Sequence, residues 1–315
     1  MTIDIDVSQQ AIQHVSVRSS DVVHGKHMTS AWLGIDLSML GVQSFVNPLV
    51  PEKEPFHYPK MMAATRAAAN GGLDFVALSA EFCADGMRPH ATLDAVNVAA
   101  QLRGVEGAGI IAEVLAEPTL IRQAIDTFAV DGAGWASLAV RIPPVIDSEQ
   151  LIAAFREIEL AGIGLVVNVK STDLTSDIVR VVAKYANMVR LQVPDPHVAR
   201  GLRYKIRAMA NSVGRDVPIV VDLGVVISAT SSAANERALL VSAINGEELF
   251  SDIPKICGTV YDVADAIERW VGLGAADGVV VHPASLPTDL ASLIRGVVPL
   301  LSGRAGVEVK QQSLV

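Results

Sequence analysis

A short run rich in β-branched residues, followed by a turn and an amphipathic segment, recurs eight times along this chain of 315 residues. Such alternation is typical of βαβ units, which place parallel strands in one sheet and helices on its faces. Eight units can close into a (β/α)8 TIM barrel, a fold that commonly takes about 250 residues as one domain. The predicted strands are 33–37, 75–78, 109–112, 135–140, 164–169, 188–193, 217–222 and 277–282.

The segments between these strands predict the helices of the barrel. They cover residues 59–70, 92–102, 117–128, 148–160, 176–185, 197–212, 233–244, 260–273 and 290–301. Residues 229–258 are longer than one crossover needs, which predicts an excursion over the barrel. We therefore expect one barrel domain at 31–302, between an N-terminal tail at 1–30 and a C-terminal tail at 303–315.

Composition narrows the class of protein further. Half of the residues are hydrophobic but only 4% are aromatic, so Val, Ile, Leu and Ala must build the core, as in parallel strands covered on both faces. The net charge of −9, with no cluster of basic residues, argues against nucleic acid as a partner. No segment has the features of a signal peptide or a membrane span, so we expect a cytoplasmic protein.

Polar residues stand where the predicted strands end, in stretches that are otherwise apolar. In a (β/α)8 barrel the carboxyl ends of the strands surround the active site. Such residues are candidates for a functional site, although many strand-end polar groups only bond loop amides. They are Asp36, Ser38, Ser79, Glu81, Glu113, Arg141, Asn168, Lys170, Gln192, Asp222 and His282.

Several collinear stretches carry a family resemblance. The first is GTVYDVADAIERWVGLGAADGVVVHPASLPTDLASLIRGVVPLL, the second is YPKMMAATRAAANGGLDFVALS, and the third contains Glu117-Pro118 at a helix start. In this order, and over most of residues 58–301, the sequence resembles the luciferase-like flavin monooxygenase superfamily, in particular its nitrilotriacetate and pristinamycin-type branch.

The resemblance implies a flavin at the strand ends. It implies reduced FMN, supplied by a separate flavin reductase, that oxidises a small organic substrate with oxygen, and a homodimer or a heterodimer with a paralogue. The family binds the flavin phosphate after the fifth strand, where this chain offers Lys170, Ser171, Thr172, Thr175 and Ser176. A capped helix start without a ligand explains the same residues. The other candidate cofactor residues are Ser38, Ser79, Glu113 and Asn168.

Two residues are candidates for catalysis. His282 ends the eighth strand, and an imidazole can accept and donate a proton near neutral pH, or it can bond a loop carbonyl. The guanidinium of Arg141 suits a phosphate or a substrate carboxylate, and a salt bridge to Glu113 or Asp147 is the alternative. We find no spacing typical of a metal site or of a Ser-His-Asp triad.

The candidate cofactor site departs from the family pattern. The glycines expected after the fifth strand are missing, and so are the hydroxyls and the aromatic residue expected after the third. This leaves two further hypotheses beside the monooxygenase. One is a non-catalytic paralogue that acts as a partner subunit or binds a ligand, since a fold does not guarantee a function. The other is a deazaflavin-dependent oxidoreductase. The sequence leaves the substrate open.

Overall fold

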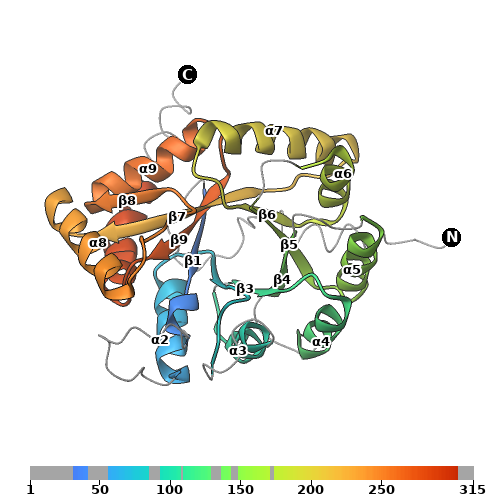
Figure 1. The fold of residues 1–315 in the computed structure, drawn as a ribbon, viewed down its shortest axis with the longest axis horizontal. Coiled ribbons are helices and arrows are strands. Elements are labelled where there is room, and N and C mark those ends of the chain that lie inside the picture. The colour runs from blue at the N-terminus through green and yellow to red at the C-terminus, as the bar shows by residue number, and fades with distance from the viewer. Residues whose placement is uncertain are drawn as a thin grey trace.

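The computed structural model describes residues 31–41, 56–84, 93–107, 109–128, 136–142, 148–170 and 174–303. Nine parallel strands lie at its centre, and helices surround them (Figure 1). The strands are β1 (Trp32–Asp36), β2 (Phe75–Leu78), β3 (Gly109–Val114), β4 (Ala136–Arg141), β5 (Gly164–Val169), β6 (Met188–Leu191), β7 (Ile219–Ile227), β8 (Lys255–Gly258) and β9 (Gly278–Pro283).

Eight of the strands form a closed barrel. β1 to β7 pair in chain order, β7 also pairs with β9, and β9 pairs with β1. The predicted (β/α)8 fold is therefore confirmed, and the eight predicted strands correspond to β1 to β7 and β9. β4 is described from Ala136 onward, so the predicted start of its strand at residue 135 lies outside the described residues.

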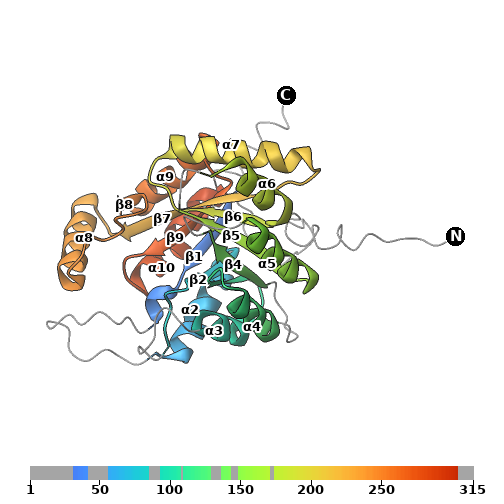
Figure 2. The ribbon, with the colours of Figure 1, turned by 45° about the vertical axis from the view of Figure 1, so that its right-hand side comes forward.

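The helices cover the outside of the barrel (Figures 1 and 2). They are α2 (Tyr58–Asn70), α3 (Asp94–Leu102), α4 (Pro118–Phe128), α5 (Ser148–Leu160), α6 (Ser176–Tyr185), α7 (Pro196–Ser212), α8 (Ser231–Asn245), α9 (Val260–Gly272) and α10 (Thr288–Ser292). A 3-10 turn, η1 (Ser38–Leu40), follows β1, and a π-helical segment, η2 (Leu293–Val297), continues α10. No helix in the described parts of the chain is long and apolar enough to cross a membrane.

The helix-covered surface of the strands and the inside of the barrel form separate apolar clusters. The larger one packs the strands against the helices. The smaller one fills the barrel with alternate residues of the strands, because successive side chains of a strand point to opposite faces. Its buried members are Phe75, Ala77, Ile111, Ala139, Val166, Met188, Val220 and Val280. Along the same inward-facing side of the strands, the next residues toward the carboxyl ends are the polar ones.

Glycines make room for the aromatic rings inside the barrel. A Cβ on Gly34 would lie 2.1 Å from the ring of Phe75, and a Cβ on Gly278 would lie 2.2 Å from the backbone oxygen of Trp32. The ring of Phe75 is fully buried, so it has no open space to move into. The narrow interior therefore accepts the Phe75 ring because Gly34, opposite it on β1, has no side chain.

Gly34→Ala is expected to destabilise the protein by about 1–3 kcal/mol, the usual cost of overpacking a dense core. Urea denaturation measures this change. Adding Phe75→Leu to Gly34→Ala should recover part of the loss, because it removes the atoms that clash. The matched control is Gly201→Ala in α7, where the new methyl group meets nothing within 4 Å. An equal loss in both single variants would contradict the packing argument.

The segment 229–258, expected as an excursion, contains α8 and a strand that the sequence analysis did not predict. β8 pairs with the last part of β7, from Gly224 to Ile227, whereas the first part of β7 pairs with β6. Phe250 packs over Gly224, where a Cβ would lie 2.4 Å from its ring, and adopts a φ of 61°. In both ribbon views α8 lies beside β8, at the outer end of the molecule.

Candidate active site at the barrel mouth

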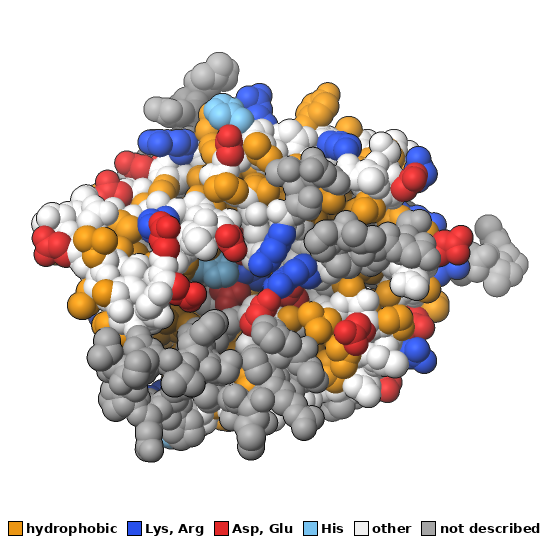
Figure 3. All heavy atoms as spheres, in the orientation of Figure 1, with side chains coloured by type: hydrophobic (Ala, Val, Ile, Leu, Met, Phe, Trp, Pro, Cys, Tyr) orange, Lys and Arg blue, Asp and Glu red, His pale blue; other side chains and the backbone are white. Residues whose placement is uncertain are grey.

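Polar side chains from the carboxyl ends of the barrel strands gather inside the barrel. Figure 3 shows acidic, basic and histidine side chains together near the middle of one face, over the strands of Figure 1. They form two groups. We call the first the Arg190 cluster (Arg190, Asp36, Asp222, His282 and Gln192) and the second the Arg141 cluster (Arg141, Glu81 and Glu113).

The Arg190 cluster is a buried ion-pair network. The Nε and Nη2 atoms of Arg190 donate to the two carboxylate oxygens of Asp222 at 2.5 and 3.0 Å, and Nη2 also donates to Asp36 at 2.9 Å. The side amide of Gln192 donates to Asp222 at 2.6 Å. The side chains of Arg190 and Asp36 are 4% exposed and that of Asp222 is 0% exposed. Four strands, β1, β6, β7 and β9, are thus tied together at their ends.

This network fixes the charges of its members. Burial alone would raise the pKa of the Asp222 carboxyl, but Arg190 and His282 hold it well below its usual range. Burial opposes ionisation of Asp36 in the same way, and His282 and Arg190 again lower its pKa. Burial would lower the pKa of Arg190, but the two carboxylates raise it. All three groups are therefore ionised at neutral pH.

His282 lies at the upper edge of the Arg190 cluster. Its Nε2 atom is 3.0 Å from an Asp222 oxygen and 2.8 Å from Nη2 of Arg190. The predicted alternative, a bond to a loop carbonyl, is not among its contacts with described residues. Nε2 can accept from Arg190 or, when protonated, donate to Asp222, but it cannot do both at once, and the cluster leaves Nδ1 unused. The His282 side chain is 23% exposed, so it is accessible from the carboxyl ends of the strands.

The Arg141 cluster lies at the ends of β2, β3 and β4. Arg141 contacts Glu113 through Nε at 2.7 Å and Nη2 at 2.9 Å, and Glu81 through Nη1 at 2.6 Å and Nη2 at 3.1 Å. The predicted alternative of a salt bridge to Glu113 is confirmed, while Asp147 lies outside the described residues. Burial would raise the pKa of Glu81, but hydrogen bonds and charge attraction from Arg141 lower it to about 2.

Asn168 lies between the two clusters in the strand register. It pairs across the sheet with Arg141 on β4 and with Arg190 on β6. The residue is 1% exposed, yet neither its amide nitrogen nor its amide oxygen has a hydrogen-bond partner among the described residues. The Oε1 atom of Gln192, the residue that follows β6, is also buried without such a partner. Buried polar atoms of this kind need a partner, from water or from a ligand.

The serines predicted for the site link the clusters to the loops. The Ser79 amide donates to Oγ of Ser38 at 2.7 Å, and the Ser38 amide donates to Asp36 at 2.9 Å. The amide of Ala80 donates to Glu113 at 3.2 Å. Ser38 and Ser79 are only partly buried, and each lies just after the carboxyl end of its strand.

The predicted phosphate-binding segment after β5 is only partly described. Ser171 and Thr172 lie outside the described residues. Lys170 is exposed at the end of β5 and is close enough to Glu81 to lower its pKa. Thr175 caps α6 by accepting from the Ile178 amide at 3.3 Å, as the alternative of a capped helix predicts, and the exposed Ser176 begins the helix.

Arg190 is not among the residues that the sequence predicts for the site. It stands in the middle of an apolar run, two residues before Gln192, which the analysis did single out. Since alternate residues of a strand face the same side, the position of Gln192 already predicts that Arg190 points into the barrel. Asp36, Asp222, Glu81 and Gln192 were recognised as strand-end residues but were not assigned to the site.

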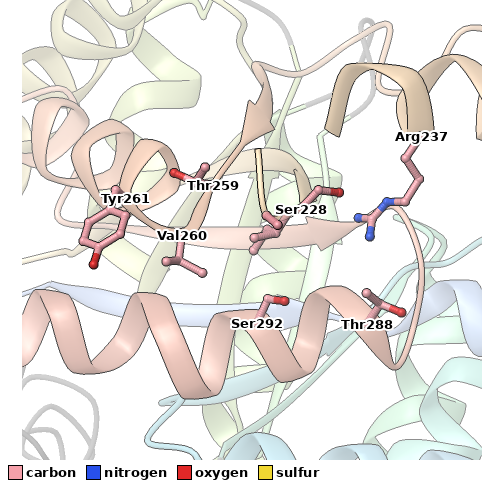
Figure 4. A pocket seen from close by; sticks show the side chains of 9 residues that line it. Ser228, Arg237, Thr259, Val260, Tyr261, Thr288 and Ser292 are labelled. Atoms are coloured by element: carbon pink, nitrogen blue, oxygen red, sulfur yellow. The ribbon is translucent and has the colours of Figure 1, made fainter. Parts of the chain in front are cut away.

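A second hollow lies beside the barrel, between α8, α9 and α10 (Figure 4). Its volume is about 470 Å³, and none of the predicted site residues lines it. Its lining residues are Ile227, Ser228, Ala229, Arg237, Thr259, Val260, Tyr261, Thr288 and Ser292. Arg237 forms an ion pair with the buried Asp289, which also accepts from the amides of Ile227 and Ser285 at 2.9 Å. This contact ties α8 and α10 to β7.

The described residues contain no group of three or more His, Cys, Asp or Glu side chains placed to hold a metal ion. Cys83 lies in the core and Cys257 is half-buried on β8, and the two form no disulfide with each other. What the mouth offers instead is a set of charged groups with fixed partners, an amide that has no partner among the described residues, and a partly exposed histidine.

No family sequence model and no curated protein sequence matches the chain. Several solved structures match it in fold. EDTA monooxygenase from Chelativorans sp. BNC1 aligns with a TM-score of 0.64 and 15% identity over 87% of this chain and 94% of its own. A riboflavin lyase whose structure holds modified FMN and riboflavin aligns with a TM-score of 0.66 and 14% identity over 88% and 92%. The coenzyme F420-dependent tetrahydromethanopterin reductase of Methanopyrus kandleri aligns at 0.60 and 12% over 86% and 99%.

Proposed function

Because this chain has the luciferase-like (β/α)8 fold, we propose that it is an oxidoreductase that binds a reduced flavin or deazaflavin at the mouth of the barrel. The FMN-dependent monooxygenase is the first form of this proposal, and the deazaflavin-dependent enzyme is the second. The cofactor would supply the electrons, for oxygen activation in the first form and as a hydride in the second. The substrate would be a small organic molecule.

The observation that carries the proposal is the buried amide of Asn168, which has no hydrogen-bond partner among the described residues. A flavin presents alternating donors and acceptors along the edge of its ring, and a side-chain amide is complementary to such an edge because it offers one oxygen and one NH2 group. Asn168 is buried at the carboxyl end of β5, and Gln192, whose Oε1 atom is also buried without a partner among the described residues, follows the neighbouring β6. These residues fit the polar edge of a flavin, and binding it would satisfy atoms that the described residues leave unpaired.

The other residues at the mouth have distinct roles in this proposal. Lys170 and the start of α6 would hold the cofactor phosphate, with Thr175 and Ser176 at the first turn. Ser38, Ser79 and Glu113 would form the wall beside the ring. His282 would transfer a proton through Nδ1, while Asp222 and Arg190 hold its ring in place. The proposal includes a separate flavin reductase, and a second copy or a paralogue as the other subunit of a dimer.

Titration of the purified protein with FMN, followed by quenching of flavin fluorescence, tests the cofactor site. We expect Asn168→Leu to weaken FMN binding by about 1–3 kcal/mol, the scale of buried polar groups left unpaired. Lys170→Ala should weaken the binding of FMN but not that of riboflavin, because riboflavin lacks the phosphate. Asn97→Leu, at an exposed position of α3, is the matched control and should bind FMN like the wild type.

The same titration with the deazaflavin coenzyme separates the two forms of the enzyme. If neither cofactor binds at millimolar concentration, the enzyme proposal fails and the non-catalytic paralogue is the remaining hypothesis. If FMN binds equally well to the wild type and to Asn168→Leu, the Asn168 amide does not contact the flavin, and the proposed cofactor site at the barrel mouth is wrong.

A further inference from the structure

Arg141 has two hydrogen-bonding edges, and a carboxylate lies on each. Glu113 lies on the inner edge, where Nη2 donates to it at 2.9 Å and Nε lies 2.7 Å from its other oxygen without the alignment of a hydrogen bond. Glu81 occupies the outer edge, formed by Nη1 and Nη2, with contacts of 2.6 and 3.1 Å. Two parallel contacts from a planar guanidinium to a planar carboxylate are the geometry by which arginine recognises carboxylates.

The two carboxylates are held very differently. The Glu113 side chain is 2% exposed, belongs to β3, and also accepts from the Ala80 amide. The Glu81 side chain is 45% exposed and lies in the turn after β2. A single buried carboxylate is enough to neutralise Arg141, so Glu113 can do so alone. Glu81 is the more exposed of the two carboxylates, so moving it from Arg141 into water costs less than moving Glu113 would.

We propose that the outer edge of Arg141 is a receptor for a carboxylate group of the substrate, and that Glu81 occupies it in the free protein. The incoming carboxylate would replace Glu81 in the same two contacts. The reaction that follows rests on the proposed oxidoreductase function, but the binding step does not require the cofactor. Arg141 then determines the substrate class. Glu81 lowers the affinity for the substrate, because it competes for the same edge of Arg141.

The exchange makes the expected affinity low in the wild type. The two contacts that the ligand makes with Arg141 replace the two that Glu81 gives up, so they add little net binding free energy. The net binding free energy must come from further contacts in the mouth, where the exposed Lys170 adds a positive charge. When an internal group occupies the site, the apparent affinity of a competing ligand equals its intrinsic affinity multiplied by the fraction of protein molecules in which the site is open. Removing the Glu81 carboxylate abolishes this competition and leaves the outer edge free.

Calorimetric titration of the flavin-free, full-length protein with succinate tests the proposal. We expect Glu81→Gln to bind succinate at least tenfold more tightly than the wild type. Glu247→Gln, at an exposed position after α8, is the matched control and should not differ from the wild type. Succinamide, which has the same length but no charge, should bind to none of the variants. Adding Arg141→Lys to Glu81→Gln should abolish the gain, because lysine lacks the planar fork.

Several results would overturn the proposal. It fails if succinate binds Glu81→Gln no more tightly than the wild type, or if the gain survives Arg141→Lys. Inorganic phosphate is titrated in parallel, since the flavin phosphate shares the anionic chemistry; a gain for phosphate without one for succinate also overturns the carboxylate assignment. Glu81→Ala replaces Glu81→Gln if thermal unfolding shows the latter to be unfolded. Because no flavin is present, failure of the cofactor titrations leaves this result unaffected.

Discussion

Replacing Arg190 with methionine is expected to lower the free energy of unfolding by about 3–5 kcal/mol, the cost of removing one partner from a buried ion pair. The substitution leaves the carboxylates of Asp36 and Asp222 in the barrel without their cation, at 4% and 0% side-chain exposure. Methionine fills much of the volume of the arginine side chain, so the loss measures charge rather than a cavity. Urea denaturation at neutral pH gives the value.

Two further variants test this explanation. Arg180→Met removes an arginine whose side chain is 64% exposed and paired with Asp177 on the surface of α6, and we expect a change below about 0.5 kcal/mol. Adding Asp222→Asn to Arg190→Met should restore part of the stability, because it removes one of the two stranded charges. Equal losses for Arg190→Met and Arg180→Met would show that burial of the Arg190 cluster contributes nothing.

Asp289→Ala is the second substitution with a large expected effect, a loss of about 3 kcal/mol. The Asp289 side chain is fully buried and accepts from the Ile227 amide, the Ser285 amide and the guanidinium of Arg237. Alanine leaves the two amides without an acceptor and Arg237 without its counter-ion. Because these donors lie on β7, α8 and the loop before α10, we expect α8 to be released along with the overall loss of stability.

Hydrogen exchange of the α8 amides, together with urea denaturation, distinguishes this local effect from a global one. Asp289→Asn retains one acceptor oxygen but no charge, and should lose less than Asp289→Ala. Asp126→Ala, at an exposed position of α4, is the control and should change stability by less than about 0.5 kcal/mol. If Asp289→Ala unfolds at the same urea concentration as this control, the proposed tie between α8 and the barrel is wrong.

The barrel was predictable because each of its strands is buried on both faces and therefore reads as a continuous apolar run. β8 was not, because its four residues include an exposed lysine and pair with only one strand. The end of β7 was also missed: Gly224 interrupts the apolar pattern, and the prediction stopped at residue 222. That glycine is required by Phe250, which lies in a different loop, and a contact of this kind cannot be read from the local sequence.

The polar residues of the candidate site follow from strand alternation, but their partners do not. Arg141 and Glu81 are 60 residues apart, and Arg190 and Asp36 are 154 residues apart, so only closure of the barrel brings them together. The sequence offered Glu113 as one of two salt-bridge partners for Arg141, and the contact with Glu113 is present. That Arg141 also holds Glu81, and that the Asn168 amide lacks a partner among the described residues, depends on distances that no sequence pattern encodes.

Pairing of the first strand with the last also has a consequence for the order of events during synthesis. β1 contacts β9 from Trp32 to Ile35, and roughly 250 residues separate the two strands along the chain. At about 5–20 residues per second, a ribosome needs about 12–50 s to make that length. For this interval one side of β1 has no neighbouring strand to bond. A nascent chain that stops before residue 278 therefore carries two unprotected edges, on β1 and β7, which are the surfaces by which unfinished β-structure aggregates.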